Sequence, residues 1–291
     1  MKAHASLYCL ALGAVFGFIA PVSAQVTLVN ETFADGGRTN GVDAGDIAWY
    51  SLGATGQTGN TVVANANFTS GQAFRFTSTS GNNVAVGNFS AVTLAGVGDY
   101  IEFSVQMRFT GTLGTAGPMI GLFDSKGTYQ AADGFGAANF TAVADDVGYK
   151  STKSIPNSTS DVVIKSQNAT ASFSSANGTT LTTGTSGGAI AANTLYSMLF
   201  RVELLAGDQL SITSTFNGGS TVTTTTGALT KTFDEAIFSA SGGAGGGGTV
   251  DFSSLLITTN VSSVPEPSTY AAFCGLVVLG LAAVSRGKRR T

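Results

Sequence analysis

Strict alternation of apolar and polar residues over positions 100–110 is the feature that most constrains the fold of this chain. Every second position is apolar and the positions between are polar or charged: Ile101, Phe103, Val105, Met107 and Phe109 against Glu102, Ser104, Gln106 and Arg108. A period of two places successive side chains on opposite faces of a β-strand. The stretch therefore predicts a strand with one buried face and one face in water.

The same period recurs along the chain and predicts an all-β body. Further strands are expected, in chain order, over residues 26–29, 73–77, 119–123, 161–165, 196–204, 209–216, 232–240 and 250–258. Outside two apolar segments at the ends, no stretch of about ten residues shows the period of a helix. We therefore predict an antiparallel β-sandwich, and the period alone leaves a barrel as the alternative.

The C-terminal residues 264–291 combine three features in a fixed order. A proline-containing segment comes first, an uncharged apolar run over residues 270–284 follows, and a basic end closes the chain with Arg286, Lys288, Arg289 and Arg290. With its flanks the run covers residues 268–285, roughly 27 Å as a helix, which just spans a hydrocarbon core. Because a basic flank stays at the cytoplasmic headgroups, we predict a C-terminal transmembrane helix with the body on the outer side.

This order resembles the PEP-CTERM sorting tail of exported bacterial proteins. The signature of the resemblance consists of Val264, Pro265, Glu266, Pro267 and Ser268. It covers only the tail, residues 264–291, and implies that an exosortase recognises this segment and removes the helix. The protein would then reach the cell envelope, the outer surface or the extracellular matrix. A plain C-terminal membrane anchor is the alternative.

The N-terminus also predicts export. Lys2 precedes an apolar run over residues 7–20, and residues 22–24 supply the small side chains that signal peptidase requires. We therefore predict a signal helix that is cleaved between Ala24 and Gln25. A retained N-terminal helix is the alternative, although the run is short for a membrane span.

Removal of residues 1–24 and 264–291 leaves a body, residues 25–263, with few groups for catalysis. The only histidine is His4 and the only cysteines are Cys9 and Cys274, all within the two removed segments. The body then has no histidine- or cysteine-dependent nucleophile, disulfide or histidine-ligated metal. It carries 16 acidic and 9 basic residues, a net charge of about −7, so nucleic acid is not an expected partner.

Several short stretches of the body resemble the rhythm of concanavalin A-like jelly rolls, namely residues 29–33, 100–110, 121–124, 145–149 and 250–252. The resemblance implies a jelly-roll sandwich. Glucanases of this fold carry Glu-x-Asp-x-x-Glu on one strand, and this sequence contains no such motif. We therefore predict a body that is not an enzyme. A lectin-like module is one alternative, and a polysaccharide lyase using Tyr149 with Lys150 or with an arginine is another.

Two acidic segments and one aromatic residue are the candidate ligand-binding positions. Asp43 with Asp46, or Asp145 with Asp146, would offer Ca²⁺ the carboxylate oxygens it prefers, although neither pair has the EF-hand spacing. The alternative for both pairs is a role as solvated turn residues. Trp49 would stack on the apolar face of a sugar if its ring is exposed, and would belong to the core if it is buried.

Together these patterns predict an exported, non-enzymatic protein of the cell envelope or extracellular matrix, structural or associated with polysaccharide. Its expected partners are signal peptidase, an exosortase-type enzyme, the membrane through residues 268–285, and exopolysaccharide. No cofactor is expected other than Ca²⁺ at the acidic segments.

Overall fold

The fold is built from strands that form two sheets. The structure, a computed structural model, describes residues 24–39, 45–53, 60–77, 81–111, 117–135, 143–155, 161–168, 173, 177–185, 187–242 and 248–261. The compact unit of the chain runs from Gln25 to Val261. The predicted tail and the signal helix before Ala24 lie outside the described residues, and within those residues no helix has the length and apolarity to cross a membrane.

Sheet A contains eight strands: β1 (Val26–Glu31), β3 (Thr61–Ala64), β4 (Gln72–Thr77), β6 (Tyr100–Thr110), β12 (Leu195–Leu204), β13 (Gln209–Phe216), β14 (Val222–Gly227) and β16 (Thr249–Thr259). Their order is β14-β13-β12-β6-β16-β4-β3, and β1 also pairs with β16. All these pairings are antiparallel. A short 3₁₀ turn, η2 (Ala206–Asp208), joins β12 to β13.

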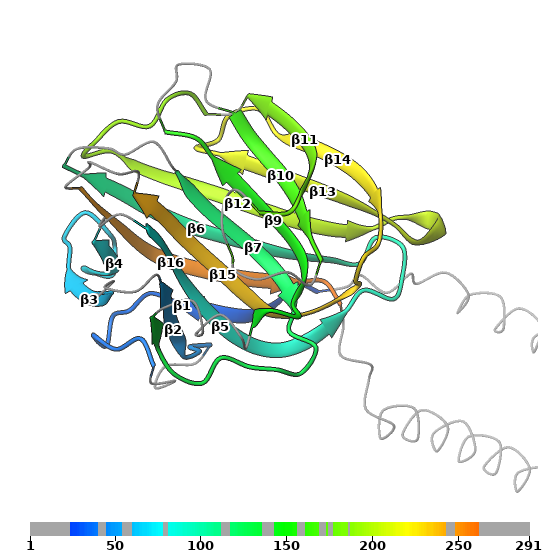
Figure 1. The fold of residues 1–291 in the computed structure, drawn as a ribbon, viewed down its shortest axis with the longest axis horizontal. Helices are drawn as coiled ribbons and strands as arrows, with labels where there is room; N and C mark the ends of the chain where they lie inside the picture. The colour runs from blue at the N-terminus through cyan, green and yellow to red at the C-terminus, as the bar shows by residue number, and fades with distance from the viewer. Residues whose placement is uncertain are drawn as a thin grey trace, which may run out of the picture. The chain divides into compact units, whose positions relative to one another are not determined.

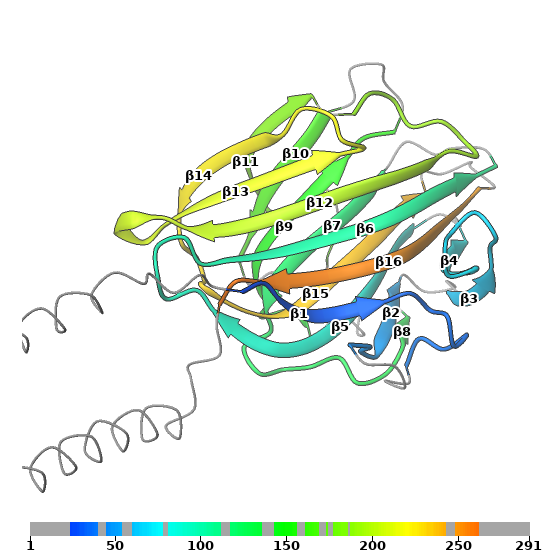
Figure 2. The same cartoon turned by 180° about the vertical axis from the view of Figure 1, so that it is seen from behind.

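Sheet B contains β2 (Trp49–Gly53), β5 (Gly81–Thr93), β7 (Pro118–Asp124), β8 (Gly134–Phe135), β9 (Val147–Lys153), β10 (Asp161–Gln167), β11 (Thr179–Thr185) and β15 (Thr232–Gly242). Their order is β11-β10-β9-β7-β15-β5-β2-β8. Only the short contact of β2 with β8 is parallel among the described strand pairs. Figure 1 shows sheet B in front of sheet A, and Figure 2 shows the same two layers from behind.

The two sheets confirm the predicted antiparallel β-sandwich. In β6 the burial alternates at every residue, as its sequence predicts, and the apolar side chains from Ile101 to Phe109 face sheet B. The interior between the sheets is rich in phenylalanine. Phe238 of β15 lies at its centre, with ring centroids 4.9 Å from Trp49, 4.9 Å from Phe252 and 5.4 Å from Phe74.

A second, smaller apolar cluster covers the outer face of sheet B. Along β7, Ile120 and Leu122 point into the interior, whereas Met119 and Phe123 belong to the outer cluster. Phe123 packs against Phe173, with ring centroids 4.7 Å apart. Strands of sheet B are therefore buried on both faces, which explains the continuous burial of β7.

Strand β16 brings the two ends of the body together. Val26 at the start of β1 pairs with Thr259 at the end of β16, and the side chain of Gln25 donates a hydrogen bond to the hydroxyl of Thr258 (2.9 Å). The first and last described segments therefore leave the sandwich at the same end. In Figure 2 this is the end where β16 stops and β1 starts.

Phe238→Ala should lower the free energy of unfolding by about 3–5 kcal/mol, because it empties the centre of the aromatic interior. Leu195→Ala is the matched control, since that side chain is 41% exposed and its truncation should change stability by about 0.5 kcal/mol or less. Urea unfolding of both variants measures the difference. Equal midpoints for the two variants would contradict this packing.

Candidate functional site

Four carboxyl side chains meet at one end of sheet B, and we call them the carboxyl cluster: Asp124, Asp146, Asp234 and Glu235. They come from three adjacent strands, because β7 pairs with β9 on one side and with β15 on the other. Asp124 lies opposite Val147, which directly follows Asp146, and Glu235 lies opposite Phe123. The strand register thus joins acidic residues that are far apart in the sequence.

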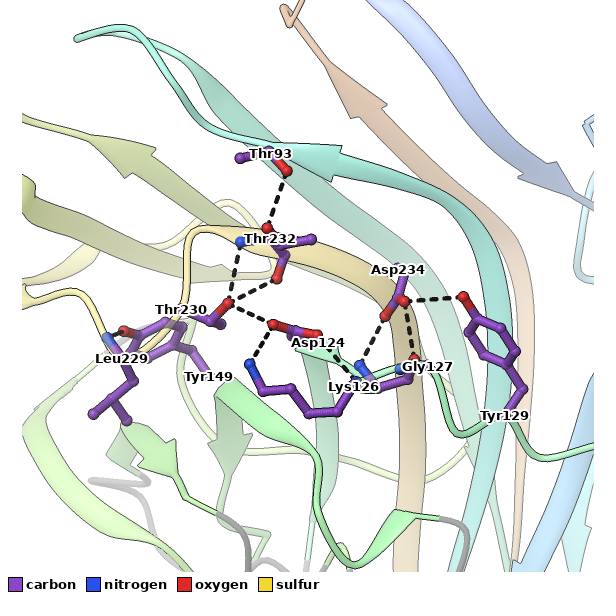
Figure 3. Close-up of polar contacts among 11 residues, drawn as sticks. Thr93, Asp124, Lys126, Gly127, Tyr129, Tyr149, Leu229, Thr230, Thr232 and Asp234 are labelled. Atoms are coloured by element: carbon purple, nitrogen blue, oxygen red, sulfur yellow. Dashed lines mark hydrogen bonds and ion pairs between the residues drawn. The ribbon is translucent and has the colours of Figure 1, made fainter.

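Asp124 is a satisfied, paired carboxylate. One of its oxygens accepts hydrogen bonds from the ammonium of Lys126 (2.6 Å) and the hydroxyl of Thr230 (2.9 Å). Figure 3 shows that Thr230 in turn contacts Thr232, so a polar chain runs from the cluster into the start of β15. Burial acts to raise the pKa of Asp124, but the hydrogen bonds from Lys126 and Thr230 hold it below its usual value.

Asp234 is satisfied by the turn that follows β7. Its carboxylate accepts hydrogen bonds from the backbone N–H (2.8 Å) and hydroxyl (2.9 Å) of Ser125, and from the hydroxyl of Tyr129 (3.2 Å). The pairing of β15 with β5 shifts register between Phe233 and Glu235. At this irregularity one residue of β15, Asp234, stands opposite residues 89–91 of β5, and Asp234 and Glu235 have separate partners.

Asp146 and Glu235 form the unusual part of the cluster. Both side chains are fully buried. One oxygen of Glu235 accepts a hydrogen bond from the Asn88 amide (3.2 Å). Its other oxygen and both oxygens of Asp146 accept no hydrogen bond from any N–H or O–H donor of the described chain. Buried acceptors without donors cost free energy, so this pair requires a proton between its two groups.

The electrostatics of the pair fit one shared proton. Burial raises the pKa of Glu235 well above its usual value, and the neighbouring charge of Asp146 raises it further. Burial also raises the pKa of Asp146 to about 7, and the charge of Asp145 contributes. Two carboxyl groups this close in a low-dielectric site do not both ionise. We therefore describe Glu235 as the protonated member of the pair and Asp146 as its acceptor.

A buried lysine lies on the neighbouring strand. The ammonium of Lys150 in β9 donates to the side-chain oxygen of Gln167 in β10 (2.7 Å). Burial lowers the pKa of Lys150 to about 7, and the nearby charge of Lys165 contributes. Tyr149 points the other way, into the interior, where its hydroxyl accepts from the N–H of Leu229 (2.7 Å). The two residues of the lyase alternative therefore lie on opposite faces of sheet B and do not converge.

The structure describes one predicted acidic pair in full, and it separates the two members of that pair. Asp145 is exposed, whereas its neighbour Asp146 is buried against Glu235. Asp43 lies outside the described residues, and Asp46 is half-buried beside Glu31, whose pKa is raised to about 7 mainly by burial. In the described ranges, no three acidic, histidine or cysteine side chains stand close enough to hold a metal ion.

The prediction that Trp49 offers its ring to a sugar is wrong. Trp49 is fully buried, and its ring packs edge-on against Phe238 in the interior. Gly87 on the paired strand makes room for the indole, since a Cβ there would lie 2.7 Å from a ring carbon. The alternative reading of this residue as part of the core is therefore the one that the structure supports.

Buried acids and a buried lysine have the pKa values that acid–base catalysis uses. A polymer chain, however, has to reach the groups that act on it. Asp146, Glu235 and Lys150 have no exposed surface in this structure, and the carboxyl cluster lies where three neighbouring strands pair. The sequence analysis singled out Asp146 but missed Glu235. Two adjacent acidic residues, Asp234 and Glu235, inside an otherwise apolar strand are unusual and could have indicated a buried site.

Comparisons with known proteins assign no family. No family model matches the sequence, and no curated protein matches it. Among solved structures, lectin II from Ulex europaeus is similar with a TM-score of 0.45 at 10% identity, covering 82% of this chain and 99% of that one. The carbohydrate recognition domain of Emp47p has a TM-score of 0.48 at 10% identity, covering 82% and 98%.

An enzyme stands among the similar structures as well. The endo-β-1,4-glucuronan lyase from the fungus Trichoderma reesei has a TM-score of 0.44 at 11% identity, covering 80% of this chain and 95% of that one. These scores and identities are too low to assign a ligand or an activity to this chain.

Glu235→Gln should weaken the pH dependence of stability. Because the folded protein holds the Glu235 proton more tightly than the unfolded chain does, the unfolded chain ionises first, and the wild type loses stability as pH rises above about 4. Glutamine has no proton to lose and can donate its amide N–H to Asp146. The variant should therefore be more stable relative to the wild type at about pH 8 than at about pH 5.

Urea unfolding at the two pH values measures this gain. Asp161→Asn is the matched control, since that carboxylate is exposed at the start of β10 and lies beside the opposite end of β9 from Asp146, and it should follow the wild type. A Glu235→Gln variant with the wild-type pH dependence would show that the pair holds no shared proton.

Proposed function

We propose that this chain is an exported, non-enzymatic protein of the cell envelope or extracellular matrix, where its sandwich serves as a structural component that associates with polysaccharide. The predicted signal peptide and the PEP-CTERM-like tail determine where the protein is delivered. In this proposal the body has the concanavalin A-like form of sandwich, signal peptidase cleaves after Ala24, and an exosortase-type enzyme removes the helix after residues 264–268.

The proposal rests mainly on one observation: the described chain enters and leaves the sandwich at the same end. Gln25, the first residue after the predicted cleavage, is hydrogen-bonded to Thr258, three residues before the last described residue. The two predicted processing positions therefore flank the folded body at the same end. Strand pairing protects the segments on the body side, because the N–H and C=O groups of β1 and β16 are engaged in the sheet.

The buried state of the reactive groups supports a non-enzymatic role. Three acids with raised pKa values, Glu31, Asp146 and Glu235, are at least nine-tenths buried. Each has a structural position in the strands, and Lys150 is buried with them. A fourth such acid, Glu102, is only half-buried; burial raises its pKa, and the charge of Arg201 opposes this shift. A polysaccharide would instead meet the polar outer face of sheet A, where residues such as Gln106 and Thr213 point outward.

Substitution of both tail prolines, Pro265→Ala with Pro267→Ala, should stop processing without changing the body. The wild type should appear as a shortened chain in the envelope or extracellular fraction, and the variant should accumulate at full length in the membrane fraction. Fractionation of the source cells with an antibody against the body measures this. Ser262→Ala is the matched control and should be processed normally.

Full-length wild-type protein in the cytoplasmic fraction would contradict the proposed export. Equal processing of the wild type and the double proline variant would contradict the sorting role of the tail.

A further inference from the structure

Three loops close one end of the sandwich, and we call them the closing loops. They connect β5 to β6, β12 to β13 and β14 to β15, over residues 94–99, 205–208 and 228–231. Backbone hydrogen bonds join them into one surface. The N–H of Leu94 donates to the oxygen of Lys231 (2.9 Å), and the N–H of Ala228 donates to the oxygen of Asp208 (3.1 Å). Figure 2 shows them at the end where β1 begins and β16 stops.

The tips of the closing loops are apolar, whereas turns are usually polar. They read Ala-Gly-Val-Gly, Leu-Ala-Gly and Ala-Leu in chain order. Val97 is 72% exposed, Leu229 is 46% exposed, and Val26 at the start of β1 is 38% exposed. Of the five large apolar side chains that are exposed in the described part of the chain, three thus lie at this end, and Leu195 lies at the other.

The charged side chains of the closing loops find their partners among the closing loops themselves. Asp99 accepts hydrogen bonds from the backbone N–H groups of Ala95 (2.9 Å) and Gly96 (2.7 Å). Asp208 forms an ion pair with Lys231 (2.8 Å). Such a surface carries few unpaired charges, so little free energy is needed to desolvate it when it contacts an apolar medium.

The chain leaves the sandwich beside the closing loops. The side chain of Asn260 donates to the backbone oxygen of Gly98 (2.9 Å) and accepts from the N–H of Tyr100 (2.7 Å). Val97 is therefore adjacent to the point where the described chain ends at Val261. Residues 262–269 can span at most about 28 Å before the apolar run of the tail begins.

We propose that the closing loops rest on the surface of the lipid bilayer as long as the tail anchors the protein, with Val97 and Leu229 entering the interface. This inference rests on the membrane-anchored stage of the proposed function. Two side chains bury too little area to hold a free protein on a bilayer. A short tether supplies a local concentration in roughly the millimolar range, at which weak contacts form. Removal of the tail would therefore release the body.

Lipid quenching in reconstituted vesicles tests this contact. The full chain with Cys9→Ser and Cys274→Ser receives one cysteine by Val97→Cys, Leu229→Cys or, as the matched control at the opposite end, Leu195→Cys. Each is labelled with a polarity-sensitive dye in vesicles of phosphatidylethanolamine and phosphatidylcholine with brominated acyl chains. We expect blue-shifted emission and at least about twofold stronger quenching at positions 97 and 229 than at 195. Unchanged urea midpoints confirm that the variants fold.

The outcomes separate the inference from the proposed function. A chain that floats with the vesicles but shows equal quenching at 97, 229 and 195 overturns the lipid contact and leaves the anchor intact. A blue shift at 97 without quenching by the lipids also overturns it, because protein then covers the surface. A chain that does not float with the vesicles contradicts the anchor itself, and the inference with it.

Discussion

The pairing of β16 with three other strands is the constraint on which the rest of the structure depends. β16 lies inside sheet A, with β6 along one edge and with β4 and β1 sharing the other. Because β16 joins β6 to β4 and β1, sheet A is complete only when the last strand of the body has been added. The same pairing fixes where the chain enters and leaves the sandwich. It therefore places both ends of the described body beside the surface that the closing loops present.

The carboxyl cluster shows how a sandwich tolerates acidic residues inside. Asp124 and Asp234 accept hydrogen bonds from turn residues, a lysine and hydroxyl groups. Asp146 and Glu235 lack such donors apart from Asn88, so a proton takes the place of a cation between them. Burial without an opposite charge favours the neutral form, and the pair accordingly destabilises the fold as the pH rises.

Much of the fold was predictable because alternation is a local signal. The strands β6 and β13 have the bounds that their period of two predicts. β12 begins one residue earlier than predicted, and β16 is one residue longer at each end. β5 was missed, since glycines and asparagines interrupt its pattern, and so was β2, which is a short strand. β9 was missed because Gly148 and Lys150 stand at buried outer positions where an apolar residue would be expected.

The candidate site was less predictable, because it depends on register between distant strands. Asp145 and Asp146 look equivalent in the sequence, yet the start of β9 turns one to solvent and the other to Glu235. Neighbours on a strand face opposite ways, which also separates Tyr149 from Lys150. The burial of Trp49 depends on Gly87 across the β2–β5 pair, and no local pattern connects these two residues.

We propose that the body associates with polysaccharide and performs no chemistry on it. The most direct test incubates purified residues 25–263 with a panel of bacterial and algal polysaccharides, with Ca²⁺ and with chelator, and assays each well for retention and for product release. The account predicts retention on a matrix polysaccharide without reducing ends or unsaturated products. Release of either product, abolished by Glu235→Gln or Lys150→Met, would contradict it.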